Sequence, residues 1–146
     1  MAVPVSTVLQ RKGHEVATIV SDASVQDALL KLAEHGVGAL VVSPDGRSIE
    51  GVLSERDIVR RLAAAGAATL EEPVEALMTR NITVCERSTT TDELVVMMTE
   101  GRIRHVPVVD DGVLSGIVSI GDIVKWRMEE LAEDAKHLES YVSGSY

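Results

Sequence analysis

The chain has 146 residues, the size of one ordinary domain, and is long enough to bury roughly 70% of its unfolded surface. Apolar residues make up 45% of it but aromatic residues only 2%, so its core must consist of Val, Leu, Ile, Ala and Met. The formal net charge of −9 argues against nucleic acid or an anionic membrane as a partner, because both favour clustered Lys and Arg. An anionic small molecule would need a locally cationic pocket.

The cysteine and histidine content gives no sign of a metal site. Cys85 is the only cysteine, so there is no disulfide framework within the chain and no cysteine-based metal set. His14, His35 and His137 are dispersed without the spacing of metal ligands, and we expect them at the surface. Residues 1–13 lack the features of a secretion signal, and no apolar run approaches the length of a membrane span. We therefore expect a soluble cytoplasmic protein.

The chain opens with an alternation of short helices and strands. Residues 5–11 form an amphipathic stretch that predicts a lead-in helix, and residues 16–20 are β-branched and predict a strand. Ser24 and Asp27 then have the spacing of a helix capping box. Apolar residues follow at helical spacing, which predicts a helix with one buried face that ends at Gly36.

A hairpin and a second helix follow. Residues 36–42 and 51–53 predict two strands, and the Pro44-Asp45-Gly46 sequence between them fits the turn of a hairpin. Residues 58–66 predict the next helix, and residues 67–73 a linker.

The second half of the chain repeats this order. Residues 74–78 predict a lead-in helix, residues 82–84 a strand, and Thr89 with Asp92 a capping box. Gly51-x-x-Ser54-x-x-Asp57 recurs 65 residues later as Gly116-x-x-Ser119-x-x-Asp122. The pattern indicates an internal duplication of a βαββα unit. The same offset of 65 matches Thr18 with Thr83, Asp27 with Asp92 and Gly36 with Gly101.

The last helix continues beyond the repeat. Its apolar residues recur at spacings of 4, 3, 4, 3 and 4, which predicts an apolar seam about two turns longer than the module. Because an isolated helix gains little from such a seam, a partner surface is implied, and we predict a homodimer. The seam consists of Val124, Met128, Leu131, Ala135, Leu138 and Val142.

The βαββα repeat, the segment Arg104-His105-Val106-Pro107-Val108-Val109-Asp110 and the two Gly-x-x-Ser-x-x-Asp endings together resemble the CBS domain family, as a stand-alone tandem pair or Bateman module. The resemblance implies an α/β (α+β) fold whose two repeats pack sheet to sheet about a pseudo-twofold axis. It also implies clefts that bind AMP, ADP, ATP, NAD(H) or S-adenosylmethionine, and a regulatory role toward an unknown protein partner. The expected boundaries are 5–66 for repeat 1, 67–73 for the linker, 74–127 for repeat 2 and 128–146 for a helical extension.

The resemblance also assigns roles to residues. A carboxylate accepts hydrogen bonds from the two ribose hydroxyls, and Asp57 and Asp122 match that position in the family. Arg104 and His105 match a cationic hinge that meets phosphate. The supporting hydroxyls and the other residues matched to the clefts are Ser54, Ser119, Thr18, Thr83 and Pro107, with Gly38, Ala39 and Arg56 in the first copy.

Simpler interpretations exist for each of these residues. Both Ser-x-x-Asp endings also have the pattern of a helix N-cap with an acidic first turn. Thr18 and Thr83 also fit ordinary strand threonines, and Arg104-His105 fits the solvated start of a strand.

Two other functions compete with nucleotide sensing. One is a structural dimerisation module without a functional nucleotide site, and the other is an enzyme that acts on the nucleotide. No Ser-His-Asp set, acid-base pair or Walker loop has the spacing that catalysis needs, so we predict no enzymatic activity.

The two clefts should be unequal. The second copy has Arg104-His105 at the hinge where the first has Gly38-Ala39. We therefore expect one tight and one weak nucleotide site, the tight one strengthened as the pH falls and His105 becomes protonated. The sequence leaves open which aspartate shares a cleft with which hinge.

Overall fold

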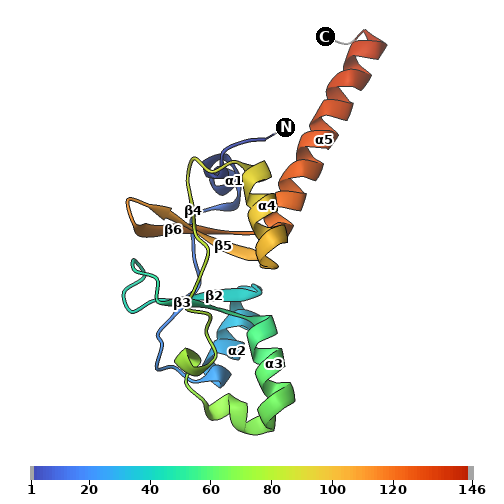
Figure 1. The fold of residues 1–146 in the computed structure, drawn as a ribbon. Coiled ribbons are helices and arrows are strands. Elements are labelled where there is room, and N and C mark those ends of the chain that lie inside the picture. Colours follow the sequence, from blue (N-terminus) through green and yellow to red (C-terminus); the bar gives the residue numbers. More distant parts are fainter. Residues whose placement is uncertain (1, 145–146) are drawn as a thin grey trace.

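The computed structural model describes residues 2–144, which form two halves of the same architecture. In each half a parallel edge strand pairs with an antiparallel hairpin, in the orders β1-β2-β3 and β4-β5-β6. The two sheets face the middle of the molecule and helices cover their outer sides (Figure 1). The predicted α+β fold of two pseudo-symmetric repeats with a long C-terminal helix is confirmed.

The elements have the following bounds. The first half contains β1 (Thr18–Ile19), α2 (Val25–His35), β2 (Ala39–Val42), β3 (Gly51–Ser54) and α3 (Glu55–Ala65). The second half contains β4 (Cys85–Glu86), α4 (Thr91–Gly101), β5 (His105–Asp110), β6 (Val113–Ser119) and α5 (Ile120–Ser143). α1 (Val5–Lys12) precedes the first half, and two 3-10 helices, η1 (Gly66–Glu71) and η2 (Val74–Ala76), connect the halves.

The lead-in segment before each repeat packs on the other repeat. α1 lies against the second half (Figure 1). It inserts Val5 and Leu9 into the core of that half, where both side chains are fully buried. In the opposite direction, η2 and the residues after it insert Val74 and Met78 into the core of the first half. Each core is therefore completed by the lead-in segment of the other repeat.

This exchange explains the glycine that opens each Gly-x-x-Ser-x-x-Asp motif. A Cβ atom on Gly116 would lie 2.9 Å from Leu9 Cδ1, and one on Gly51 would lie 2.7 Å from the carbonyl oxygen of Thr79. At Gly51 the clash would be with backbone, so the crossing of the lead-in segment requires a glycine there, whereas at Gly116 a Cβ would force the buried Leu9 side chain to shift.

The repeat offset is not constant along the chain. Eight residues separate the paired residues Val42 and Gly51, whereas seven separate Val108 and Gly116. The offset is therefore 65 after the hairpins but 66 before them. The match of Thr83 with Thr18 was one residue out of register.

That error moved the predicted elements of the second repeat. The strand predicted at residues 82–84 is instead β4, which pairs Cys85 with Val108. The capping box predicted for Thr89 and Asp92 is formed instead by Thr90 and Glu93. The Thr90 N–H donates to the Glu93 carboxylate, and the Glu93 N–H donates to the Thr90 hydroxyl.

Other elements differ in extent. The strand predicted at residues 16–20 is reduced to β1, and the helix predicted from residue 58 starts three residues earlier as α3. At α2 only the Ser24 half of the predicted capping box forms. The predicted linker at 67–73 is largely the 3-10 helix η1, which buries Thr69, and the lead-in helix predicted at 74–78 is only the turn η2.

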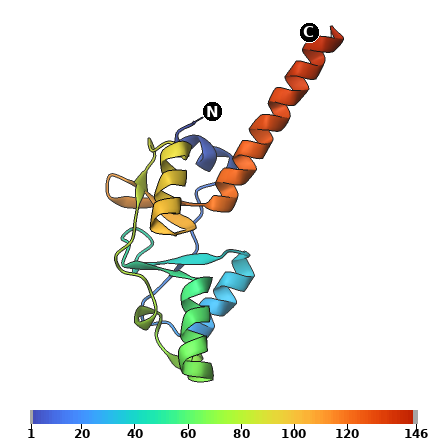
Figure 2. The same ribbon diagram turned by 45° about the vertical axis from the view of Figure 1, so that its right-hand side comes forward.

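α5 leaves the body of the molecule after its first turns and continues alone to the C-terminus (Figure 2). The predicted seam is exposed along it: Met128 is 66% exposed, Leu138 64% and Val142 79%. Residues 145–146 of the predicted extension lie outside the described residues. Among residues 2–144, no helix is long and apolar enough to cross a membrane.

Replacing Leu9 with Ala should destabilise the second half of the molecule, since truncating a buried leucine costs about 2–5 kcal/mol. Leu30→Ala, on the exposed face of α2, is the matched control and should change the free energy of unfolding by less than about 0.5 kcal/mol. Urea unfolding measures the loss, and hydrogen exchange locates it. β5 and β6 should lose protection before β2 and β3, and the reverse order would contradict the exchanged packing.

Candidate functional site

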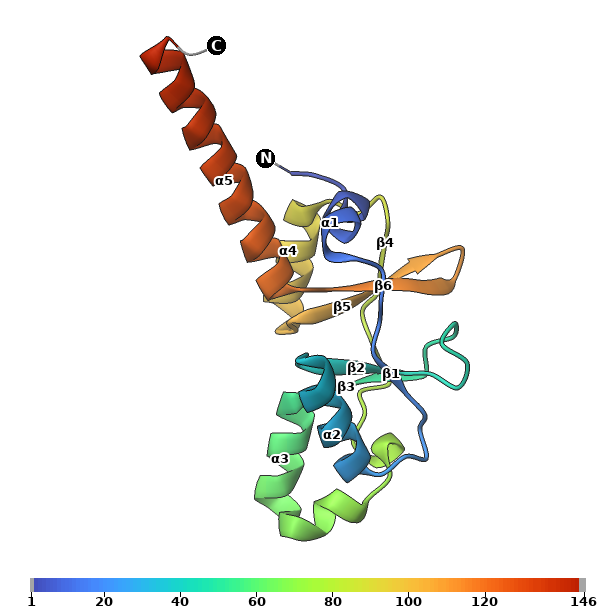
Figure 3. The ribbon, with the colours of Figure 1, turned by 180° about the vertical axis from the view of Figure 1, so that it is seen from behind.

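A cleft of about 540 Å³ lies between the two halves, where the N-terminus of α3 meets the hinge before β5. Figure 3 shows the two sheets that face each other at this level. Three segments form its walls: the β3–α3 junction, residues 79–83 before β4, and residues 101–105 at the end of α4. Its polar lining includes Ser54, Glu55, Arg56, Asp57, Arg60, Thr79, Asn81, Thr83, Arg102, Arg104 and His105.

Asp57 is both a helix cap and a free hydrogen-bond acceptor. Its Oδ2 accepts the Ser54 backbone N–H at 2.9 Å and the Ser54 hydroxyl at 3.0 Å, while its own N–H donates to Ser54 Oγ at 3.3 Å. No hydrogen bond from residues 2–144 reaches its Oδ1. Capping therefore uses one carboxylate oxygen and leaves the other for a ligand, so the two interpretations of this motif are compatible.

The cleft is locally cationic although the protein is acidic. Arg56, Arg60, Arg102 and Arg104 line it, against the carboxylates of Glu55 and Asp57. Arg102 ends α4 in a left-handed conformation (φ 52°), and its carbonyl accepts a hydrogen bond from Arg56 Nη1 at 3.5 Å. Guanidinium groups in such a cluster favour an anionic group such as phosphate.

The two hinges meet at the centre of the molecule. The Gly38 carbonyl accepts the N–H of Glu55 at 3.0 Å, and the Arg104 carbonyl accepts that of Ile120 at 2.9 Å, so equivalent bonds hold both hinges to their following helices. A Cβ on Gly38 would lie 3.2 Å from His105 Cε1. The small residue in the first hinge thus makes room for the imidazole of the second.

Burial sets the charge of His105. Desolvation lowers the pKa of His105 below 6.5, with help from the positive charges of Lys12 and Arg104, while the carboxylates of Asp122 and Glu55 oppose the shift. Its imidazole is therefore neutral at physiological pH.

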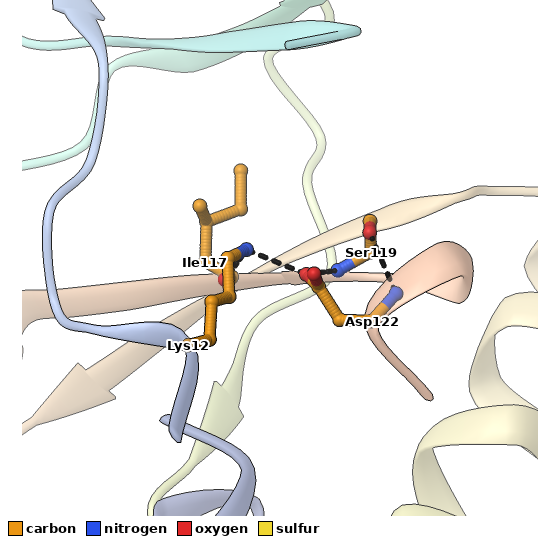
Figure 4. Close-up of polar contacts among 4 residues, drawn as sticks. All are labelled: Lys12, Ile117, Ser119 and Asp122. Atoms are coloured by element: carbon orange, nitrogen blue, oxygen red, sulfur yellow. Dashed lines mark hydrogen bonds and ion pairs between the residues drawn. The ribbon is translucent and has the colours of Figure 1, made fainter. Parts of the chain in front are cut away.

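The second Ser-x-x-Asp motif lies outside this cleft and has a different partner. Asp122 Oδ2 accepts the Ser119 N–H at 2.8 Å, as in the first motif, but it also accepts Lys12 Nζ at 2.5 Å (Figure 4). The same ammonium donates to the carbonyl of Ile117 at 2.6 Å. Burial would raise the pKa of Asp122, but the hydrogen bonds from Lys12 and Ser119 outweigh it and hold the pKa below its usual value.

The structure brings most of the predicted site residues together and separates the rest. Thr18 lies in a separate hollow with Asp27 and Asp45, and Ala39 and Pro107 are buried in strands. Asp57 shares its cleft with the hinge of the other repeat, a pairing that the sequence left open. The predicted residues that line this cleft are Gly38, Ser54, Arg56, Asp57, Thr83, Arg104 and His105.

Several contributors were not predicted. Arg102 lies two residues before Arg104 in the sequence. This clustering of basic residues could have indicated that Arg102 also lines the cleft. Arg60 lies one helical turn after Asp57 on α3, a spacing that brings side chains to one face of a helix. Lys12 precedes the first repeat, and no motif in the sequence connects it with Asp122.

A family model for the CBS domain matches the chain twice, at residues 5–64 and 74–129. The chain belongs to the CBS domain family. It is 33% identical to the mitochondrial CBS domain-containing protein CBSX3 of Arabidopsis thaliana, over 97% of this chain and 73% of that protein. A CBS-domain containing protein from Agrobacterium tumefaciens is 44% identical in its crystal structure, with a TM-score of 0.83 over 86% of this chain and 99% of that chain.

Two similar CBS structures contain adenosine compounds. A CBS domain protein from Pyrobaculum aerophilum, complexed with AMP, is 28% identical with a TM-score of 0.73 over 82% of this chain and 89% of that chain. The CBS domain pair of protein MJ0100, in complex with 5-methylthioadenosine and S-adenosyl-L-methionine, is 25% identical with a TM-score of 0.78 over 89% and 99%. CBS pairs of this fold therefore bind adenosine ligands.

The lowered pKa of His105 makes the stability of this CBS pair sensitive to mild acid. Unfolded His105 takes up a proton near pH 6.5, whereas the folded residue does so only at lower pH. The contribution of His105 is thus fully present above pH 6.5 and is lost as the pH falls through the folded pKa.

Thermal melts between pH 7.5 and 5 should show a smaller acid-induced loss for His105→Gln than for the parent. His137→Gln, on the exposed part of α5, is the control and should follow the parent. Identical pH profiles for His105→Gln and the parent would contradict the assignment.

Proposed function

We propose that this CBS pair binds an adenosine ligand that carries phosphate in the cleft of Asp57 and Arg104, and signals its presence to a protein partner. The observation that carries the proposal is the placement of the free Oδ1 of Asp57 in the same cleft as four arginines. A carboxylate and a guanidinium cluster are the two groups that a nucleotide requires, one for the ribose diol and one for the phosphate.

The size and charge of the cleft support a nucleotide such as AMP. Its volume of about 540 Å³ falls within the range of small-molecule sites, roughly 300–1,000 Å³. S-adenosylmethionine has a sulfonium cation where AMP has a phosphate. The positive charges of the four arginines in the cleft would repel that sulfonium group. AMP, ADP, ATP or NAD(H) therefore fit the lining better than S-adenosylmethionine does.

We further propose that the module regulates a partner rather than catalysing a reaction. Incubation with ATP, ADP and NADH followed by chromatography tests this, and a new product would contradict it. The expected cytoplasmic location stays a prediction, since the Arabidopsis relative is described as mitochondrial.

Replacing Asp57 with Asn should weaken AMP binding about 10- to 150-fold, because a hydrogen bond to a charged acceptor contributes about 1.5–3 kcal/mol. The asparagine oxygen can still accept the Ser54 N–H, so the cap is largely retained. Isothermal titration calorimetry measures the affinity.

Glu93→Gln is the matched control for Asp57→Asn. Glu93 accepts the N–H of Thr90 in the capping box of α4, yet it does not line the cleft. It should cost similar stability and leave AMP affinity unchanged. Equal affinity in Asp57→Asn and the parent would leave Asp57 with capping as its only role.

The exposed face of α5 supports a second proposal, that two copies of the chain pair through this helix. The alternating spacing of 4 and 3 residues keeps its apolar side chains on one face, as in helices that pair with a like helix. Such a face, exposed along the helix beyond the body of the module, is typical of an interaction surface. In this arrangement residues 5–127 form the sensing module and residues 128–146 carry the pairing face.

Polar substitution of the seam should abolish the dimer. Leu131→Gln combined with Leu138→Gln removes two apolar contacts, while Lys136→Gln alters the helix away from the seam. In sedimentation velocity, the parent and Lys136→Gln should be dimers and the double variant a monomer. A monomeric parent, or an unchanged dimer in the double variant, would exclude pairing through α5.

A further inference from the structure

The two Ser-x-x-Asp motifs are alike in local geometry and differ in what approaches them. Both aspartates accept the N–H of their serine through Oδ2 and donate their own N–H to its hydroxyl. In the first half the cleft in front of the motif is open, whereas in the second half Lys12 lies against the carboxylate (Figure 4). We propose that Lys12 holds Asp122 in an internal ion pair that keeps nucleotide from this second motif, so that the chain binds one nucleotide and not two.

This inference rests on the proposed function, since it treats Asp122 as the counterpart of Asp57. The offset of 65 relates both the two aspartates and the strand residues beside them, Val52 and Ile117. The Val52 carbonyl accepts the backbone N–H of Thr79 at 2.9 Å. The Ile117 carbonyl accepts the ammonium of Lys12 at 2.6 Å instead. The ammonium of Lys12 therefore donates to the strand carbonyl that in the first half accepts a backbone N–H from Thr79. In this position the ammonium also contacts Asp122.

The neighbouring residue fixes Lys12 in this position. Arg11 stacks on the ring of Trp126, with its guanidinium carbon 4.5 Å from the ring centre. It also forms ion pairs with Glu129 at 3.1 Å and Glu133 at 3.4 Å. The last turn of α1 is thus attached to α5 beyond the Lys12 contact, and this attachment positions the ammonium against Asp122.

The ion pair weakens what a ribose would bind: Lys12 contacts Oδ2, the oxygen that also accepts the Ser119 N–H, and neutralises the charge that Oδ1 would offer to the ribose hydroxyls. A carboxylate that is neutralised by an ammonium is a weaker acceptor for hydroxyl groups, and the ammonium also occupies space next to it. The hinge of the first half has Gly38-Ala39 where that of the second half has Arg104-His105, so it supplies no guanidinium to a ligand at Asp122. The pair is partly exposed, at 29% for Lys12 and 22% for Asp122, so its removal leaves a carboxylate that water and ligand can reach.

Calorimetric titration of the full chain with AMP tests this proposal. The parent should bind one AMP per chain, and Lys12→Met should bind two. Adding Asp122→Asn to Lys12→Met should return the stoichiometry to one. Lys136→Met, which removes an exposed lysine of α5, is the control and should bind one, and circular dichroism melts report the folding of each variant. If Lys12→Met does not fold, Lys12→Gln removes the charge while keeping a donor for the Ile117 carbonyl.

The outcomes separate this inference from the proposed function. Two AMP per parent chain, or a single AMP in both Lys12 variants, would overturn the role of Lys12 while leaving the first cleft as a nucleotide site. A loss of affinity on replacing Lys12 would also overturn it, because the lysine would then be a ligand for phosphate. No binding by the parent or any variant would refute the proposed function itself.

Discussion

The exchange of lead-in segments is the constraint on which the rest of the molecule depends. Leu9 completes the core of the second half and Met78 that of the first, so the two sheets are held face to face by the same residues that fill their cores. The crossing also builds the site. The segment that crosses β3 continues into Thr83 on the wall of the open cleft, and the helix that crosses β6 ends in Lys12. The short segments that complete the two cores therefore also carry residues of the candidate site and of the Asp122 ion pair.

The first Ser-x-x-Asp motif shows how one carboxylate can cap a helix and still leave an oxygen open to a ligand. The oxygen that faces the helix N-terminus is fixed by the backbone N–H of Ser54, which orients the carboxylate without occupying its second oxygen. A preoriented acceptor loses little side-chain freedom when a ligand binds. The N-terminal end of the α3 dipole also favours a negative charge at this position.

The sequence predicted those features that local patterns determine. The hairpins, the helix that ends at Gly36 and the two Ser-x-x-Asp endings each depend on neighbouring residues, and they were located correctly. β4 was misplaced because it is only two residues long and was positioned by an offset measured on the other side of a hairpin that differs by one residue. The exchange of α1 and the contact of Lys12 with Asp122 join residues about 110 positions apart, and no local pattern reports such a contact.

α5 begins at the Ser119 cap and runs unbroken for 24 residues. At 1.5 Å per residue it is about 36 Å long, and only its first turns touch the body of the molecule. Arg11 attaches this helix to α1 as far as Glu133, and the part beyond, about 15 Å long, continues without that support. A tilt of about 10° about this attachment would carry the tip of the helix by about 3 Å, so a rearrangement around Asp122 and Arg11 would be passed to a point far from the cleft.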